Sequence, residues 1–327
     1  MDERFDILIL GSGVAGLTAA LAAADRAQVL VLAKDSLDKT STALAQGGIA
    51  AVFGPDDSFD SHTRDTLKAG AGLCDPDVVE LCVSEAPAAI AELAQLGVGF
   101  ERAADNGKEV FDLGREGGHS RRRIVHSKDQ TGRRVEDVLL DKVRAHPSIT
   151  VRDLSLAVDF ITLGSLEGDK PGDEATGDRC IGSYVMDKRT GAIHTVGAGA
   201  TIVATGGAGK VYLYTSNPDV STGDGVAMAA RAGARIADME FFQFHPTCLY
   251  HPLTKNFLIS EAVRGEGGKL ITSSGDRFMP GYHEDAELAS RDTVARAIDA
   301  ELKRTGDDCV YLDLTHRDAS FIEDRFP

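Results

Sequence analysis

The first fifty residues alternate between apolar runs and turns of small residues. Residues 5–10 are almost entirely apolar, a glycine-rich segment follows at 11–16, and residues 17–24 are again apolar. A further apolar run covers residues 28–33. A short apolar run beside glycines is typical of a buried strand, and a longer run is typical of a helix. The pattern therefore predicts strand, turn, helix and strand, which is the start of a βαβ unit.

The rest of the chain alternates between helical and strand patterns of apolar residues. Apolar residues at helical spacing predict helices over residues 60–69, 76–96, 135–145, 224–234 and 291–298. Asp75 before Pro76 predicts the start of the second of these helices. Alternating patterns predict strands from residue 150, a hairpin of residues 181–186 and 193–196, and a buried strand over 200–204 that returns to the first sheet. Residues 164–179 are rich in Gly, Asp and Glu and predict a solvent loop.

The glycines of the first turn have the spacing of a dinucleotide-binding site. Gly11 allows the tight turn, Gly13 lets the backbone approach a pyrophosphate, and Gly16 lets the helix pack closely on the strand. The N–H groups at the start of the helix would hold the phosphate charge. A glycine turn without a ligand is the alternative interpretation, and the complete strand–turn–helix context argues against it.

The second strand and the loop after it indicate which dinucleotide binds. An NAD site usually has Asp or Glu at the end of this strand, where the chain has Lys34. The small residues of segment 41–48 end in Gly47 and Gly48, whose exposed backbone suits contact with a flat ring. A flexible loop is the alternative. Together the turn and the loop favour a long cofactor such as FAD.

Composition and charge narrow the class of protein. The chain has 327 residues, 43% of them hydrophobic, which suits one large and one smaller domain of a folded α/β enzyme. A net charge of −16 argues against nucleic acid or an anionic membrane as partner. The five cysteines are scattered and never CxxC, which predicts reduced thiols in a cytoplasmic protein without a metal site. Neither a signal peptide nor a membrane-spanning stretch is predicted.

The last third of the chain contains the candidate chemistry. His245, Arg264 and Arg291 each lie beside a turn, a glycine segment or a predicted helix start. Arginine binds planar carboxylates through two parallel hydrogen bonds, so the set predicts a site for an acidic substrate. Each residue also has a structural interpretation: a core histidine for His245, an ion pair for Arg264, and a helix cap or surface residue for Arg291. Asp224 is equally a helix N-cap or an acceptor from a cofactor hydroxyl.

The motifs together resemble the L-aspartate oxidases, within the succinate dehydrogenase/fumarate reductase flavoprotein superfamily. The resemblance rests on segments spread over nearly the whole chain, in family order: 11–16, 41–48, 115–120, 204–207, 217–225, 243–250, 261–267 and 291–292. It implies an α/β fold, with a Rossmann-like FAD-binding domain over residues 1–237 and a smaller α+β capping domain over residues 238–327.

The resemblance also implies roles for individual residues. It implies FAD contacts from Ser12, Gly13, Val14, Ala15, Lys34, Ser41, Thr42, Ala43, Leu44, Ala45, Gln46, Gly47, Gly48 and Asp224. It implies a noncovalent flavin, because Ser41 stands where membrane-bound relatives have the attaching histidine. Glu116 and His245 are expected to contact the substrate together with Arg264. Arg291 is expected to be the catalytic proton donor or acceptor.

The activity implied is oxidation of L-aspartate to iminoaspartate, with electrons passing to oxygen or fumarate. The product would enter NAD biosynthesis, with a hand-off to quinolinate synthase. Two alternatives remain: a soluble fumarate reductase acting on dicarboxylates, and an inactive fragment. The last arises because chains of this family continue beyond residue 327 and supply a further substrate histidine and arginine. The sequence is therefore expected to be an N-terminal piece with poor catalysis.

Overall fold

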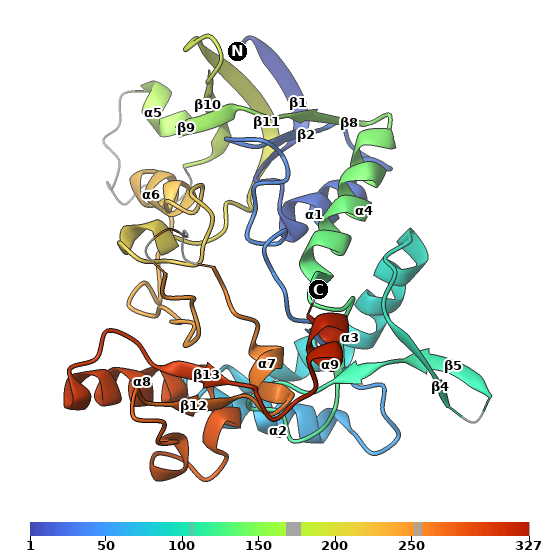
Figure 1. Ribbon diagram of the computed structural model, residues 1–327. Coiled ribbons are helices and arrows are strands. Elements are labelled where there is room, and N and C mark those ends of the chain that lie inside the picture. Colours follow the sequence, from blue (N-terminus) through green and yellow to red (C-terminus); the bar gives the residue numbers. More distant parts are fainter. Residues whose placement is uncertain (106, 168–177, 252, 254–256, 327) are drawn as a thin grey trace. The chain divides into compact units, whose positions relative to one another are not determined.

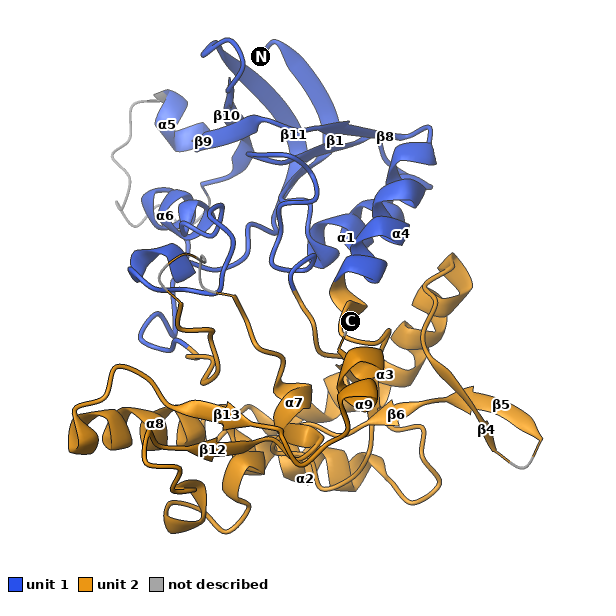
Figure 2. Ribbon diagram, in the orientation of Figure 1, with its two compact units in different colours: residues 1–44, 133–242 blue, residues 45–132, 243–327 orange. Residues whose placement is uncertain are grey.

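The chain folds into two compact units, each made from two separate stretches of sequence (Figure 2). The computed structural model describes residues 1–105, 107–167, 178–251, 253 and 257–326 (Figure 1). Unit 1 comprises residues 1–44 and 133–242, and unit 2 comprises residues 45–132 and 243–327. The sequence places residues 45–132 in the first domain, whereas they pack in unit 2.

Unit 1 is organised around one mixed sheet (Figure 1). Its strands are β1 Glu3–Leu10, β2 Val29–Leu32, β8 Ile149–Arg152, β9 Ser155–Thr162, β10 Cys180–Asp187 and β11 Ile193–Val203. Its helices are α1 Val14–Ala24, α4 Thr131–Ala145, α5 Leu163–Glu167, the short 3₁₀ helix η1 Gly209–Val211, and α6 Asp224–Arg231. The first two residues of α4 belong to unit 2.

The sheet has the strand order β8-β2-β1-β11-β10-β9. The first four strands are parallel and the last two join antiparallel. In the register, Leu8 of β1 lies between Leu30 of β2 and Thr201 of β11. Leu8 and Leu30 are fully buried, as a parallel strand covered on both faces requires. The predicted βαβ unit is therefore confirmed.

Two glycines set how closely the first strand, its helix and β11 approach. A Cβ on Gly16 would lie 2.1 Å from the carbonyl oxygen of Gly11, and a Cβ on Gly11 would lie 2.2 Å from that of Ala204. Gly11 also has a φ of +115°, which side-chain-bearing residues rarely adopt. Helix α1 begins at Val14, three residues before the predicted start. The last three residues of the glycine segment are therefore part of the helix, and Gly13 is its extended N-cap.

Three predictions for unit 1 are wrong in detail. The strands predicted at 193–196 and 200–204 are one continuous strand, β11, and its last residues are partly exposed rather than buried. Helix α6 ends at Arg231 instead of residue 234. The predicted loop 164–179 begins with helix α5, and residues 168–177 lie outside the described residues.

Unit 2 combines helices with small sheets. Its helices are α2 Phe59–Ala69, α3 Pro76–Leu96, α7 Glu261–Gly265, α8 Arg291–Thr305, α9 Ala319–Arg325 and the 3₁₀ helices η2 Met279–Gly281 and η3 Ala286–Leu288. Its strands are β3 Ile49–Ala50, β4 Arg102–Asp105, β5 Lys108–Phe111, β6 Leu113–Gly114, β7 Ile124–Val125, β12 Lys269–Ile271 and β13 Tyr311–Asp313. They form the sheets β3-β7-β6, β4-β5 and β12-β13.

The helix predictions for unit 2 are confirmed and its strands were not predicted. Helix α3 begins as expected, with the Asp75 carboxylate accepting from the backbone N–H of Asp77 at 3.0 Å and Pro76 in the first turn. Helix α8 starts at Arg291 but continues to Thr305. Strands β4 and β5 are short and polar, so the alternation that indicates a strand is absent from them.

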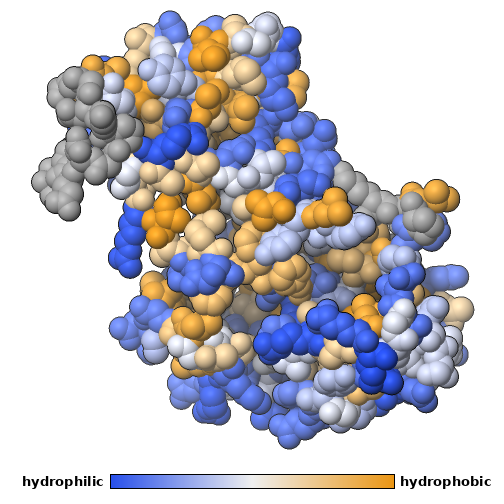
Figure 3. All heavy atoms as spheres, turned by 90° about the vertical axis from the view of Figure 1, so that its left-hand side faces the viewer, coloured by the Kyte–Doolittle hydropathy of each residue, from blue (hydrophilic) through white to orange (hydrophobic). Residues whose placement is uncertain are grey.

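No helix in the described part of the chain is long and apolar enough to cross a membrane. The face drawn in Figure 3 mixes hydrophilic residues with scattered hydrophobic ones.

Helix α4 buries one acidic side chain with its apolar residues. Glu136 has no exposed surface, and neither carboxylate oxygen has a hydrogen-bond partner within the described residues. Burial raises the pKa of Glu136 to about 7, and the nearby Thr40 hydroxyl offsets only part of this effect. The carboxyl is therefore neutral in the folded protein at pH values where an unfolded chain would ionise it.

Replacing Gly16 by Ala should destabilise unit 1 by about 1–3 kcal/mol, because the new methyl group overlaps the Gly11 carbonyl. Thermal unfolding followed by circular dichroism measures the effect. Gly207→Ala is the matched control, since a Cβ there has no atom within 4 Å. Equal unfolding temperatures for the two variants would contradict the close packing described here.

Glu136→Gln should change stability in a pH-dependent way. Because the folded pKa of Glu136 is raised to about 7, its favourable contribution is complete below about pH 4.5 and is lost as the pH rises to 7. Glutamine has no charge to bury, so the variant should match the parent near pH 4.5 and exceed it by about 1–3 kcal/mol at pH 8. Denaturant unfolding at both pH values tests this. Asp141→Asn, at an exposed position of the same helix, should show no such trend.

Candidate functional site

Unit 1 contains a pocket at the carboxyl ends of its parallel strands. Its volume is about 420 Å³, within the range of small-molecule sites. The lining includes predicted cofactor residues Ser12, Gly13, Val14, Ala15, Lys34, Ser41, Thr42 and Asp224. It also includes residues that the sequence did not single out, among them Thr40, Ser155 and Ser221. Ligands of open α/β sheets bind at this edge, so the position suits a cofactor.

The start of helix α1 forms one wall of the pocket. Gly13 is the N-cap residue and has no side chain to accept from the first turn. The N–H of Val14 donates to the Thr42 hydroxyl at 3.0 Å, which ties the following loop to the helix start. The remaining N–H groups of the first turn and the positive end of the helix dipole suit a phosphate group.

A charged pair forms the opposite wall. Lys34, two residues after the end of β2, binds the carboxylate of Asp224, the first residue of α6, and both contact the Thr222 hydroxyl. Burial raises the pKa of Asp224, but the hydrogen bonds from Lys34 and Thr222 outweigh it and leave that pKa below its usual value. The N-cap of α6 is Gly223, so the capping interpretation of Asp224 is wrong.

The predicted cofactor loop divides between the units. Ser41 and Thr42 line the pocket of unit 1, and the Ser41 hydroxyl lies 3.4 Å from that of Ser221. Ala43 and Leu44 belong to unit 1 but are not in the pocket lining. Ala45, Gln46, Gly47 and Gly48 belong to unit 2. Their contact with a cofactor stays a prediction.

Within unit 2, Gly47 and Gly48 lie against Glu116. The N–H of Gly48 donates to the Glu116 carboxylate at 3.3 Å, and a Cβ on Gly47 would lie 2.7 Å from the same oxygen. Burial, and then the negative charge of Glu261, raise the pKa of Glu116. No ion pair of Glu116 is found among the described residues. A cationic group placed here would therefore gain a partly buried carboxylate.

Glu261 joins three segments of unit 2. Its carboxylate accepts from the N–H of Gly117 at 3.1 Å and from the Arg291 Nε, and it lies 3.5 Å from the Arg264 Nη2. Only 6% of Glu261 is exposed. The sequence reasoning missed it as a site residue, because Arg264 lies between Glu261 and Glu266 along the chain and the pattern gave no sign of which acid has a further role. The nearest signal was its position after the helix-capping Ser260.

The two arginines differ in their surroundings. Arg264 is 2% exposed, donates to the Glu287 carbonyl at 2.7 Å, and has no hydrogen-bond partner for Nε and Nη2 within the described residues. Its contact with Glu261 agrees with the ion-pair interpretation. Arg291 is 35% exposed in its side chain and also donates to Gln243 at 3.0 Å. It therefore starts a helix without being a free surface residue.

His245 completes the cluster as a neutral donor. Burial and the positive charge of Arg291 lower its pKa to about 4, so the ring is uncharged near neutral pH. Its Nδ1 accepts from the Thr247 N–H at 3.3 Å, which leaves the proton on Nε2. The ring is only partly buried, unlike a core histidine. Glu116, Glu261, Arg264, Arg291 and His245 thus form one electrostatic group, which we call the acid-substrate cluster.

FAD fits the residues of the unit 1 pocket. The uncapped first turn of α1 and the side-chain-free Gly13 suit its pyrophosphate, and the Lys34–Asp224 pair offers a donor and an acceptor for ribose hydroxyls. Among the described residues, no group of three or more His, Cys, Asp or Glu side chains is placed to hold a metal ion.

The chain is similar in sequence to several L-aspartate oxidases. The chain is 54% identical over 324 residues to L-aspartate oxidase 1 of Ralstonia nicotianae, covering 99% of this chain and 59% of that protein. It is 49% identical to the L-aspartate oxidase of Vibrio cholerae, covering 100% of this chain and 60% of that protein. The chain therefore spans about three fifths of the length of these relatives, and the resemblance to them is confirmed.

A solved structure supports the fold. A quinol fumarate reductase chain of E. coli matches with a TM-score of 0.87 and 32% identity, covering 99% of this chain and 56% of that one. Residues 6–327 match the family described as FAD binding domain. FAD is thus the cofactor indicated for this protein. Because the match extends over almost the entire chain, the protein belongs to the FAD binding domain family.

Proposed function

We propose that the protein takes part in the FAD-dependent oxidation of L-aspartate to iminoaspartate, with oxygen or fumarate as electron acceptor. One observation carries the proposal: the acid-substrate cluster combines cationic and neutral donors with a partly buried carboxylate, Glu116, that has no ion-pair partner among the described residues. A dicarboxylate alone needs only the donors. A dicarboxylate with an ammonium group also needs the acid. The L-aspartate oxidases named above have the same activity in their names.

Each side chain of the cluster has a defined task in this proposal. The ammonium group of the substrate lies against Glu116, whose carboxylate is also held by the Gly48 N–H. The substrate carboxylates accept hydrogen bonds from Arg291, from the Nη2 of Arg264, which makes no hydrogen bond within the described residues, and from the Nε2–H of His245. These contacts orient the Cα–H bond, which provides the geometric part of catalysis.

In the oxidation of aspartate, the protein has to accept only one proton, from the substrate nitrogen. FAD supplies the hydride acceptor when bound, through the N5 atom of its flavin ring. The substrate ammonium group must pass one proton to the Glu116 carboxylate before hydride leaves Cα. Because the Cα hydrogen leaves as hydride, no base for a carbon-bound proton is needed. Arg291 keeps its charge and holds a carboxylate, with Glu261 fixing its orientation.

Fumarate reduction is the second candidate activity. The E. coli quinol fumarate reductase chain supports it through its fold, and Arg291 and His245 would serve any dicarboxylate. In that direction the carbanion formed at carbon is far more basic than guanidine, so Arg291 can act as proton donor. Glu116 distinguishes the two activities, because fumarate has no ammonium group to meet it.

The chemistry of the product supports a partner in the same compartment. An imine of aspartate hydrolyses in water, so we propose direct hand-off to quinolinate synthase. The five cysteines are free, and among the described residues none is paired, which supports a cytoplasmic location.

The flavin should be bound without a covalent link, because Ser41 offers no nucleophile comparable to an attaching histidine. Acid precipitation of the yellow protein should release all colour into the supernatant, as measured by its absorbance near 450 nm. Colour that stays with the precipitated chain would contradict this prediction.

Glu116→Gln should lower kcat/KM for L-aspartate by about ten- to a hundredfold, the effect of losing one charge-assisted bond. Fumarate reduction should fall less than threefold. Glu109→Gln, at an exposed position of β5 in the same unit, is the control and should change neither rate. Equal losses in both reactions would mean that Glu116 supports the fold and does not select the amine.

The same variant has a pH signature. Glu116 binds an ammonium group only when ionised, and its pKa is raised by burial. In the parent protein kcat/KM for L-aspartate should therefore rise with pH through a value above the ordinary carboxyl range. This acidic limb should be absent from the Glu116→Gln profile.

A further inference from the structure

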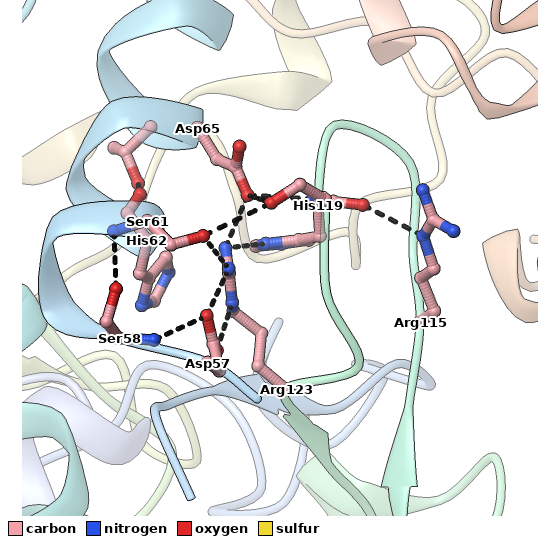
Figure 4. A network of polar contacts seen from close by, with 10 residues as sticks. Asp57, Ser58, Ser61, His62, Asp65, Arg115, His119 and Arg123 are labelled. Carbon is pink, nitrogen blue, oxygen red and sulfur yellow. Dashed lines mark hydrogen bonds and ion pairs between the residues drawn. The ribbon is translucent and has the colours of Figure 1, made fainter. Parts of the chain in front are cut away.

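A fully buried arginine, Arg123, lies among Asp57, Asp65 and His119 (Figure 4). Arg123 has 0% exposure and its guanidinium binds two carboxylates. Its Nε and Nη2 donate to the two oxygens of Asp57 at 2.8 and 2.7 Å, and its Nη1 donates to Asp65 at 2.7 Å. Both acids come from the α2 region, so this bidentate contact fixes the guanidinium plane relative to that helix.

The negative charges of Asp57 and Asp65 strengthen their bonds to Arg123. Burial raises the pKa values of Asp57 and Asp65, but hydrogen bonds outweigh it and leave both below their usual values, so both acids are ionised. A buried arginine between two carboxylates is costly to desolvate, and this cost is offset only when the geometry of its bonds is good.

The network continues into residues 115–120, which we call the Glu116 loop. Asp65 accepts from the N–H and the hydroxyl of Ser120 at 2.8 and 2.7 Å. The Nη1 of Arg123 lies 3.3 Å from the Nδ1 of His119, and the His119 carbonyl accepts from Arg115 at 2.9 Å. The His119 N–H in turn donates to the carbonyl of Glu116 at 3.3 Å. The chain of contacts thus runs from Arg123 to the residue that faces the ammonium group.

The Glu116 loop has little stiffness of its own. Gly117 and Gly118 lie in its middle, and Gly118 adopts a φ of +81°. On the cluster side, the loop is held by the bond from Gly117 to Glu261 and by one from Gly118 to the Leu288 carbonyl at 3.2 Å. On the other side, it is held by the Asp65–Arg123 network, by the Ser61 hydroxyl 3.3 Å from that of Ser120, and by the His62 ring beside His119. Without these contacts, the Glu116 loop would be free to shift as a unit.

We propose that Arg123 is a positioning residue, which sets the place of the Glu116 carboxylate through His119 and Asp65 and so contributes to selection of an amino substrate. The inference rests on the proposed function, since it concerns the same carboxylate. Arg123 itself touches no substrate. Arg123 also sets the tautomer of His119. Because Arg123 donates to the Nδ1 atom, the His119 ring is neutral with its proton on Nε2, so no imidazolium competes with the ammonium group for Glu116.

Arg123→Lys tests the proposal, because lysine retains the charge but has no fork to bind Asp57 and Asp65 together. With FAD bound, kcat/KM for L-aspartate should fall about ten- to a hundredfold, as expected for a carboxylate displaced by about 1 Å. Fumarate reduction should fall less than threefold. Arg304→Lys, which alters the pair of the exposed Arg304 with the buried Glu301 of α8 in the same unit, is the control and should change neither rate.

A double variant separates positioning from general damage. In a Glu116→Gln background, Arg123→Lys should cost less than threefold for L-aspartate, because the carboxylate it positions is gone. Full additivity, or equal loss of both reactions in the single variant, would overturn the proposal. If Arg123→Lys does not fold, His119→Ala keeps the buried ion pairs and the Asp65–Ser120 bonds and removes the contact between Arg123 and the His119 ring. It should give the same selective loss.

A measurement that does not depend on enzyme turnover separates failure of this proposal from failure of the proposed function. The parent His119 should show the Nε2–H tautomer by ¹⁵N NMR and a pKa of about 4, caused by burial and by the Arg123 charge. Arg123→Gln should raise this pKa. Absence of aspartate oxidation in the parent would refute the proposed function alone. An unchanged His119 titration in Arg123→Gln would refute the link to the loop whatever the parent's activity.

Discussion

The buried carboxylate of Glu261 is the interaction on which unit 2 depends for its chemistry. It joins the Glu116 loop, helix α7 and helix α8, three segments that are otherwise far apart in sequence. A hydrogen-bonded buried charge is stable only if all its partners are present, so each segment fixes the other two. The relative places of an acid for the amine and arginines for the carboxylates follow from this single group.

The local part of the structure was predictable and the long-range part was not. The turn at residues 11–16, helix α3 with its Asp75 cap, and the start of α8 at Arg291 are encoded by neighbouring residues. The Gly117 and Arg291 partners of Glu261 and the acids around Arg123 come from segments 30 to 144 residues away. No pattern of spacing within a segment contains that information. The arginines of the basic region were visible, but not which one is buried.

The same distinction explains the errors. Residues 193–203 read as two strands because glycines at 197 and 199 interrupt the apolar pattern, although pairing with β1 keeps them extended. The segment 45–132 is continuous with the predicted cofactor loop along the chain but packs in unit 2, and the extent of the FAD-binding domain over residues 1–237 stays a prediction. In both cases a tertiary contact decides what local propensity leaves open.

The central position of β1 has a consequence for how the protein is made. One edge of β1 pairs with β2, which emerges from the ribosome almost at once, but the other edge pairs with β11, whose residues follow about 190 positions later. Until then the growing chain carries an apolar strand with an open edge, a feature that favours wrong pairing between nascent chains. Translation speed and chaperone access over this interval should therefore influence yield more than the stability of the finished sheet does.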